Sequence, residues 1–251
     1  WGPRHNARMQ IDLPTPMLAG LSPAQFMRKH WQKKPLLVRQ AFADAQPPAS
    51  LKELAVLAAR DDVESRLVTA FGGDWKLKHG PVSRLPAMSK PGWTLLVQGL
   101  DQHVAEARAL LDLFRFAPDA RLDDLMLSVA SDGGGVGPHF DSYDVFLIQL
   151  AGKRRWRIGA QRDAVLRDDV PLKIIANFKP EQEFVLEPGD MLYLPPGWAH
   201  DGVAVGPGCM TGSVGFRAST AEGLAAELLP RFLDEVDGTG KLYADPRQEA
   251  S

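Results

Sequence analysis

The spacing of hydrophobic positions changes near residue 120, and the change separates two kinds of predicted structure. Before that point apolar residues recur every three to four positions, which is typical of amphipathic helices. The predicted helices are Ala24–Trp31, Leu51–Arg60 and Val104–Phe114. Ser22 before Pro23 and the capping-box pair Ser50 and Glu53 mark the starts of the first two. A short strand is predicted at Leu36–Arg39.

After residue 120 the chain reads as short apolar runs separated by Gly, Pro, Asp and Asn, the pattern of strands and turns. The predicted strands are Leu125–Ala130, Val145–Leu150, Arg154–Ile158, Lys173–Phe178, Glu183–Leu186, Met191–Leu194 and Met210–Phe216. Because no helical pattern separates these runs, a β-sandwich or barrel is favoured over a parallel sheet. A last helix follows the capping box of Ser219 and Glu222 and runs from Thr220 to about Val236. The predicted fold class is therefore α+β.

Composition narrows the class of protein. The chain has 251 residues, of which 45% are hydrophobic and 24% charged, as in ordinary globular proteins. The net charge of -2 gives no global attraction to nucleic acid, so no stable nucleic-acid binding is predicted. A single cysteine excludes an internal disulfide, and no apolar run is long enough to cross a membrane. We expect a cytoplasmic protein whose residues 1–8 are a cloning remnant outside the fold.

A candidate metal site is centred on the glycine-rich segment 133–141, which ends in His139, Phe140 and Asp141. Residues i and i+2 of a strand point to one face, so His139 and Asp141 can reach one point. His200 follows Pro195-Pro196-Gly197-Trp198 near the end of another predicted strand and offers a third ligand. Two histidines and one carboxylate hold Fe(II) with open positions in many oxygenases. The alternative is a structural histidine that hydrogen-bonds Asp141.

A candidate anion-binding residue follows in the predicted strand 153–158. With a period of two, Lys153, Arg155 and Arg157 share one face, which we interpret as solvated, with contact to RNA as the alternative. Arg154 then shares the inward face with Trp156. A buried guanidinium needs an anion and suits a carboxylate, so Arg154 is predicted to bind an anionic co-substrate. An internal salt bridge is the alternative.

Four further polar residues share strand faces with these sites. Ser128 and Ser213 interrupt apolar strands, and an inward hydroxyl of either could donate to the same carboxylate. Asp124 has the parity of Ser128, and Tyr143 that of His139, if the chain is extended there. Asp124 and Tyr143 are therefore predicted to line the mouth of the site.

These motifs together resemble the JmjC-type 2-oxoglutarate oxygenases, and more closely the bacterial ribosomal oxygenases that hydroxylate an arginine of a large-subunit ribosomal protein. The resemblance is carried by segments 133–141, 152–156, 187–200 and 213–217, and upstream by 30–35, 65–68 and 122–128. It covers most of residues 22–217. It implies a double-stranded β-helix core, an Fe(II) cofactor, 2-oxoglutarate and O2 as co-substrates, and a large-subunit ribosomal protein as partner.

The resemblance also implies a role for each matched residue. His139, Asp141 and His200 would ligate iron, and Arg154 would hold the distal carboxylate of 2-oxoglutarate. Ser128 and Ser213 would lie near that co-substrate, while Asp124 and Tyr143 would line the arginine-binding region. These roles follow from the family's motifs and are expectations for this chain.

The resemblance further implies how the chain is divided. A JmjC catalytic domain is expected over 9–218, and 219–251 is expected to be the start of a helical segment that forms a homodimer. The family's C-terminal winged-helix-like domain is expected to be absent from this sequence.

Three alternative functions remain open at this point. The first is a JmjC oxygenase with another target, such as a histidine hydroxylase, a methyl-lysine demethylase or an RNA-modifying enzyme. The second is a zinc-binding cupin that acts as an isomerase or hydrolase, since zinc accepts the same ligands. An inward Arg154 and the lack of an obvious general base beside the triad count against it. The third, a catalytically silent ribosome-binding module, is disfavoured by the complete triad.

Overall fold

The computed structural model describes residues 11–218 and 221–235. The chain divides into two compact units, Trp1–Arg217 and Ala218–Ser251. The predicted remnant at residues 1–8 lies outside the described residues. Among the described residues, no helix is both long enough and apolar enough to cross a membrane.

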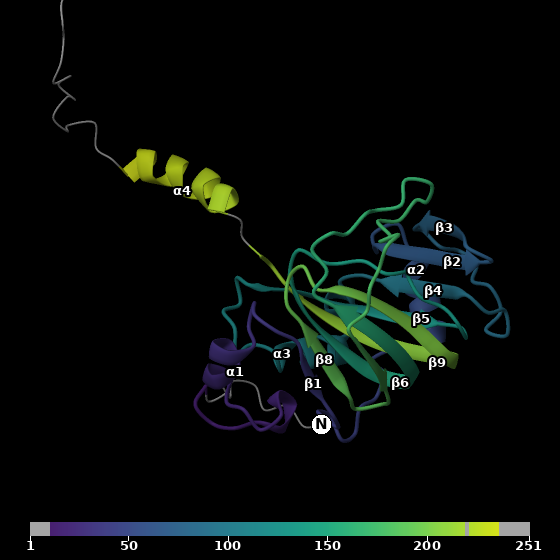
Figure 1. Ribbon diagram of the computed structural model, residues 1–251, viewed down its shortest axis with the longest axis horizontal. Coiled ribbons are helices and arrows are strands. Elements are labelled where there is room, and N and C mark those ends of the chain that lie inside the picture. Colours follow the sequence, from purple (N-terminus) through teal and green to yellow (C-terminus); the bar gives the residue numbers. More distant parts are fainter. Residues whose placement is uncertain (1–10, 219–220, 236–251) are drawn as a thin grey trace, which may run out of the picture. The chain divides into compact units, whose positions relative to one another are not determined.

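The first unit is built on one curved antiparallel sheet, and it confirms the predicted α+β class with a double-stranded β-helix core (Figure 1). The strands are β1 (Leu36–Val38), β2 (Ser65–Phe71), β3 (Asp74–His79), β4 (Trp93–Val97), β5 (Leu122–Ala130), β6 (Asp144–Gly159), β7 (Gln182–Leu186), β8 (Met191–Leu194) and β9 (Ala199–Phe216). They pair in the order β1-β8-β6-β9-β5-β4-β2-β3, and β7 also pairs with β6.

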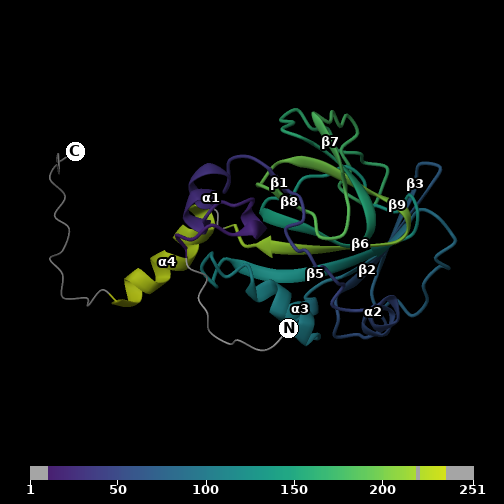
Figure 2. The ribbon, with the colours of Figure 1, turned by 90° about the horizontal axis from the view of Figure 1, so that it is seen from below.

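Short helices close the outside of this sheet. They are α1 (Pro23–Lys29), α2 (Leu51–Ala58) and α3 (Ala105–Asp112), together with the 3-10 turns η1 (Pro16–Leu18) and η2 (Leu100–Gln102). Ser22 caps α1 as predicted and also forms a capping box with Gln25, and the predicted capping box of Ser50 and Glu53 is formed. Leu54 of α2 and Leu111 of α3 are buried in the core behind β4 and β5, on the side of these strands that Figure 2 shows covered by α2 and α3. The second unit contains α4 (Ala221–Glu235), close to the predicted bounds.

Strands β6 and β9 form the longest pair in the barrel, because they remain paired along almost their whole length. The pairing runs from Asp144 opposite Phe216 to Gly159 opposite Ala199. It shifts register around Ala151, beside Gly152, whose φ of 61° is the left-handed conformation that glycine adopts without strain. The two strands predicted at Val145–Leu150 and Arg154–Ile158 are therefore one bent strand.

One other predicted strand was wrong, and three strands were missed. Segment 173–178 is not a strand, because only Ile175 makes an isolated bridge, to Leu166. There the Asn177 side chain donates to the Asp163 carbonyl and accepts from Val165, which holds the chain as a loop. Strands β2, β3 and β4 were missed, and they form one wall of the cavity described next.

Candidate metal and co-substrate site

The structure brings His139, Asp141 and His200 together, with their ligand atoms within 4.8 Å of one another. His139 and His200 face each other across an isolated bridge, in which each backbone N–H donates to the other carbonyl at 2.9 and 2.7 Å. The glycine-rich approach is required here, since a Cβ on Gly137 would come within 2.9 Å of Ile174 and its φ is 80°. Asp141 follows on the loop after the bridge, rather than on a strand as predicted.

Hydrogen bonds fix which nitrogen each imidazole presents. Nδ1 of His139 lies 2.8 Å from the Gly137 carbonyl, and Nδ1 of His200 lies 2.9 Å from the Trp198 carbonyl. Because a carbonyl only accepts, both Nδ1 atoms carry a proton, so Nε2 is the nitrogen that each ring can offer to a metal. This is the arrangement that metal-binding histidines use.

Charge at the triad also suits a cation. Burial, and then the neighbouring His139, lower the pKa of His200 to about 3, so this imidazole is neutral at pH 7. Burial raises the pKa of Asp141, while His139 and a hydrogen bond from Tyr143 oppose the shift. Two imidazole nitrogens and one carboxylate, which must be ionised to bind, fit the ligand set preferred by Fe(II).

Arg154 is buried on the inner face of β6, as the alternation predicts. Arg154 as a whole residue is only 4% exposed, whereas Lys153 and Arg155 are exposed. Nε donates to Oγ1 of Thr211 at 2.9 Å, and Nη1 donates to the Gly202 carbonyl at 3.1 Å. Nη2 is buried with no hydrogen-bond partner among the described residues. A buried guanidinium with an unused donor fits the carboxylate of a bound anion.

Thr211 is held in turn by Gln149, and sequence reasoning missed both. The Thr211 hydroxyl donates to Oε1 of Gln149 at 3.0 Å, and Nε2 of Gln149 donates to the Ala151 carbonyl at 2.7 Å. Thr211 therefore acts as an acceptor toward Arg154 and as a donor toward Gln149. Thr211 shares strand parity with Ser213 on β9, so the period-two rule applied there once more could have found it.

The triad and Arg154 line one cavity of about 860 Å³. All eight residues singled out from the sequence lie on its walls, together with others that were not; the predicted set is Asp124, Ser128, His139, Asp141, Tyr143, Arg154, His200 and Ser213. Ser128 is buried and its hydroxyl donates to the Thr211 carbonyl at 3.2 Å. That proton is therefore already used, in contrast to the donation to a carboxylate considered from sequence. Ser213 is also buried on the wall.

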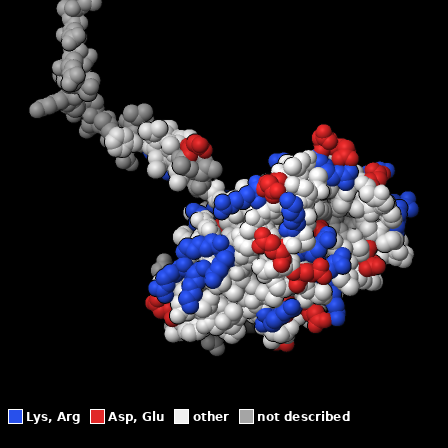
Figure 3. Space-filling model, viewed as in Figure 1, with Lys and Arg blue, Asp and Glu red and all other residues white. Residues whose placement is uncertain are grey.

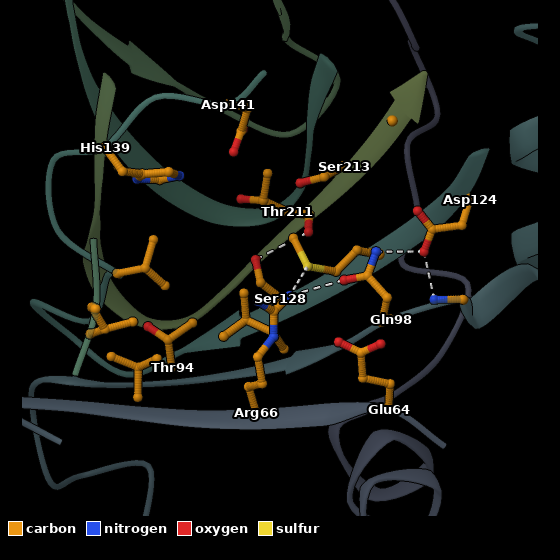
Figure 4. Close-up of a pocket in the computed structure, with 18 of the residues that line it drawn as sticks. Glu64, Arg66, Thr94, Gln98, Asp124, Ser128, His139, Asp141, Thr211 and Ser213 are labelled. Carbon is orange, nitrogen blue, oxygen red and sulfur yellow. Dashed lines mark hydrogen bonds between the residues drawn. The ribbon is translucent and has the colours of Figure 1, made fainter. Parts of the chain in front are cut away.

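The end of the cavity away from His139 is polar (Figure 4). The carboxylate of Asp124 accepts hydrogen bonds from the side chain of Gln98 and from the Gly99 N–H, each at 2.7 Å. Tyr143 is 40% exposed and hydrogen-bonds Asp141. Arg66 and Gln98, which come from the missed strands or directly after them, also lie here. Their strands were not predicted: Arg66 lies in segment 65–68, which carries the resemblance but was given no role, and no sequence pattern marked Gln98.

The face formed by Lys153, Arg155 and Arg157 is partly neutralised by ion pairs. Lys153 pairs with Glu187 at 2.5 Å, and Arg157 pairs with Asp201 at 2.6 Å. In Figure 3 the basic side chains gather instead where α1 lies. The exposed cations of α1 and the turn after it are Arg28, Lys29, Lys33 and Lys34.

A double-stranded β-helix with two histidines and one carboxylate at an open cavity defines a cupin-type metal site. Comparison with known proteins then identifies the domain: residues 109–224 match the JmjC domain. The chain is 40% identical over 227 residues to the ribosomal protein uL16 3-hydroxylase of Escherichia coli, covering 88% of this chain and 59% of that protein. It is 39% identical over 234 residues to a probable ribosomal oxygenase of Haemophilus influenzae, covering 90% of this chain and 55% of that protein.

Solved structures give the same result. The structure of the ribosomal oxygenase YcfD of Escherichia coli in complex with cobalt and 2-oxoglutarate matches with a TM-score of 0.77 at 39% identity. That match covers 92% of this chain and 61% of YcfD. The chain thus carries a JmjC domain, and its resemblance to the bacterial ribosomal oxygenases is confirmed. It spans less than two thirds of the length of these relatives.

Proposed function

We propose that this chain is an Fe(II)- and 2-oxoglutarate-dependent protein hydroxylase that acts on an arginine side chain of a large-subunit ribosomal protein. One observation carries the proposal: the buried guanidinium of Arg154, whose Nη2 has no partner among the residues that the structure describes, lies on the same cavity as a two-histidine, one-carboxylate cluster. A metal ligand set alone would serve many reactions. The added anion anchor selects those that consume a dicarboxylate beside the metal.

Each residue has a defined task in this reaction. His139, Asp141 and His200 would hold Fe(II) through two Nε2 atoms and one carboxylate, and Arg154 would hold the far carboxylate of 2-oxoglutarate. When bound, iron with 2-oxoglutarate and O2 supplies the oxidation, with succinate and CO2 as the co-products. The chain itself orients the co-substrate and excludes water, since Arg154 and His200 are both buried.

The substrate end of the cavity suits a cationic side chain. Asp124 presents a half-buried carboxylate there, and Tyr143 presents a hydroxyl beside it. Burial raises the pKa of Asp124, while hydrogen bonds from Gly99 and Gln98 oppose this and support the ionised form. A guanidinium that enters this end would find acceptors, as the resemblance implies for Asp124 and Tyr143.

Intact-mass analysis of modified ribosomal proteins tests the proposal. The chain is incubated with Fe(II), ascorbate, 2-oxoglutarate and unmodified large-subunit ribosomal proteins, beside a His139→Ala control. We expect one protein to gain a single oxygen atom, mapped to an arginine, only with the wild-type chain. The activity of the Escherichia coli relative makes uL16 the first protein to examine.

Other outcomes would redirect the proposal in distinct ways. Succinate production without a modified protein would retain the oxygenase and contradict the ribosomal substrate. An oxygen on histidine, or the loss of a methyl group from lysine, would support the other JmjC activities. Neither product nor succinate from metal-loaded protein would contradict the oxygenase and favour a zinc-binding cupin.

We also propose a cytoplasmic homodimer that forms through the second unit. Helix α4 exposes apolar side chains at spacings that fall on one helical face: Leu224, Leu228, Leu229 and Phe232. Light scattering of the wild-type chain and of Leu228→Lys tests this proposal. A dimer that becomes a monomer in the variant is expected, whereas a monomeric wild-type chain would contradict it.

A further inference from the structure

A chain of hydrogen bonds links three side chains at the substrate end of the cavity (Figure 4). Arg66 of β2 donates from Nη2 to Oε1 of Gln98 at 3.0 Å. Gln98, directly after β4, donates from Nε2 to Oδ2 of Asp124 on β5 at 2.7 Å. A cation, an amide and an anion from three neighbouring parts of the sheet are thus connected in series.

The donors and acceptors in this series of hydrogen bonds can be assigned in only one way. A guanidinium has donors only and an ionised carboxylate has acceptors only. The amide of Gln98 must therefore turn its oxygen to Arg66 and its nitrogen to Asp124. Arg66 consequently prevents the amide from flipping, and the amide in turn holds the carboxylate.

The two hydrogen bonds that Asp124 accepts from the described part of the chain fall on the same oxygen. Oδ2 accepts from Gln98 and from the Gly99 N–H, each at 2.7 Å. The other oxygen, Oδ1, faces Gly215 of β9: a Cβ built on Gly215 would lie 3.8 Å from Oδ1 and 3.7 Å from the ring of Tyr143. Gly215 lines the cavity. Oδ1, which accepts no hydrogen bond from the described residues, and the tyrosine ring therefore flank a slot that exists because residue 215 has no side chain.

We propose that Gln98 is a positioning residue that turns Oδ1 of Asp124 toward the slot over Gly215, so that a cationic side chain is received by one carboxylate oxygen instead of a two-oxygen fork. Arg66 sets the orientation of Gln98. This inference rests on the proposed function, because it assigns Asp124 to substrate binding. It goes further by naming what orients that carboxylate and where the cation must lie.

The test uses Gln98→Met, which keeps the length of the side chain and removes both hydrogen bonds. The substrate is a uL16 peptide with its arginine, and binding is also measured on the Co(II)-loaded chain with 2-oxoglutarate, which requires no turnover. We expect KM and Kd for the peptide to rise about tenfold, the scale of losing a hydrogen bond to a charged group. We expect kcat, the affinity for 2-oxoglutarate and uncoupled succinate formation to remain unchanged.

Two further variants separate positioning from a general structural effect. In an Asp124→Asn background, Gln98→Met should add little further loss, since both changes remove the same interaction. Gln182→Met, the same substitution at an exposed position of β7 that does not line the cavity, is the matched control and should bind the peptide normally. Additive losses from Gln98 and Asp124, or an equal loss in the Gln182 control, would overturn the assignment.

A variant at the slot keeps the inference testable if Gln98→Met does not fold. Gly215→Ala places its Cβ at 3.7 to 4.0 Å from its neighbours, which is ordinary contact, so we expect it to fold. It should weaken peptide binding while leaving 2-oxoglutarate affinity intact. Wild-type peptide affinity in Gly215→Ala would overturn the slot.

The proposed arginine substrate and the positioning role of Gln98 would be contradicted by different results. A wild-type chain that does not bind the arginine peptide would overturn the proposed substrate, and this inference with it. A wild-type chain that binds the peptide, while Gln98→Met binds it equally well, would overturn this inference alone.

Discussion

The Arg154→Met substitution tests whether the buried guanidinium is an anchor for the co-substrate or a structural part of the barrel. Methionine fills similar space without charge. In the structure Nε of Arg154 donates to Thr211 and Nη1 donates to the Gly202 carbonyl. Nη2 is buried without a partner among the described residues. An anchor has such an unused donor, whereas an internal salt bridge would have an acidic partner.

The magnitude follows from these contacts. Without Arg154 the far carboxylate of 2-oxoglutarate would lie in the cavity without its charged partner, a loss of about 3 to 4 kcal/mol on the scale of truncated buried charge pairs. At 1.4 kcal/mol per factor of ten, the dissociation constant would rise between about 10²- and 10³-fold. The free energy of unfolding should change little, by about 1 kcal/mol, since two lost hydrogen bonds are offset by removal of a buried unpaired donor.

Calorimetric titration of 2-oxoglutarate into the Co(II)-loaded chain measures the first effect, and urea denaturation measures the second. Metal binding by the variant serves as its internal control, because Arg154 is not among the proposed metal ligands. Wild-type affinity for 2-oxoglutarate in Arg154→Met would refute the assignment. A large loss of stability with weakened metal binding would show instead that Arg154 holds the barrel together.

Three other variants test neighbouring contacts. Thr211→Val removes the acceptor for the anchoring guanidinium, so calorimetry should show about tenfold weaker 2-oxoglutarate binding, and an unchanged affinity would contradict that role. Gly202→Ala would place a Cβ 2.5 to 2.8 Å from the ring of Trp156 and should cost about 1 to 3 kcal/mol in urea denaturation. Burial alone would raise the pKa of Asp190, but two backbone N–H donors and Arg39 outweigh it and lower that pKa. Asp190→Asn should therefore destabilise the chain at pH 7, and the difference should shrink as pH falls below about 4, where the unfolded carboxyl protonates; a difference independent of pH would contradict this.

Two kinds of local pattern identified site residues from the sequence. One is a single charged residue on the apolar face of a strand, and the other is a glycine-rich or proline-rich turn beside a histidine. Arg154 could be assigned to the inner face because β6 is exposed on its other face there, so that a period of two is visible in Lys153 and Arg155. His139 and His200 were marked by their glycine and proline surroundings. Such local signals depend on neighbours in sequence and need no knowledge of pairing.

The cavity wall formed by β2, β3 and β4 could not be predicted from such local sequence patterns. β4 is buried along its whole length, because Leu95 and Val97 pack into the core while Thr94 and Leu96 line the cavity. A strand covered on both faces does not alternate between polar and apolar residues, so its pattern resembles any short apolar run. Gln98 directly follows β4, and it was not identified because β4 was not predicted. The substrate end is therefore the part of the site that pairing between distant strands creates.

The register of β6 and β9 explains why the metal end and the anchor end stay at a fixed separation. His200 pairs with Ile158, and Arg154 pairs with Ala204 on the same two strands. Four residues of strand separate these two rungs by about 13 Å. Both the ligand and the anchor point into one cavity, and the reach of the guanidinium shortens this interval toward the length of a small dicarboxylate. Because the strands are hydrogen-bonded on both sides of each rung, the interval cannot change without breaking the ladder. This pair of strands would thus set the distance between the proposed metal ligand His200 and the proposed anchor Arg154, whereas β2, β4 and β5 supply the wall that carries Arg66, Thr94 and Asp124.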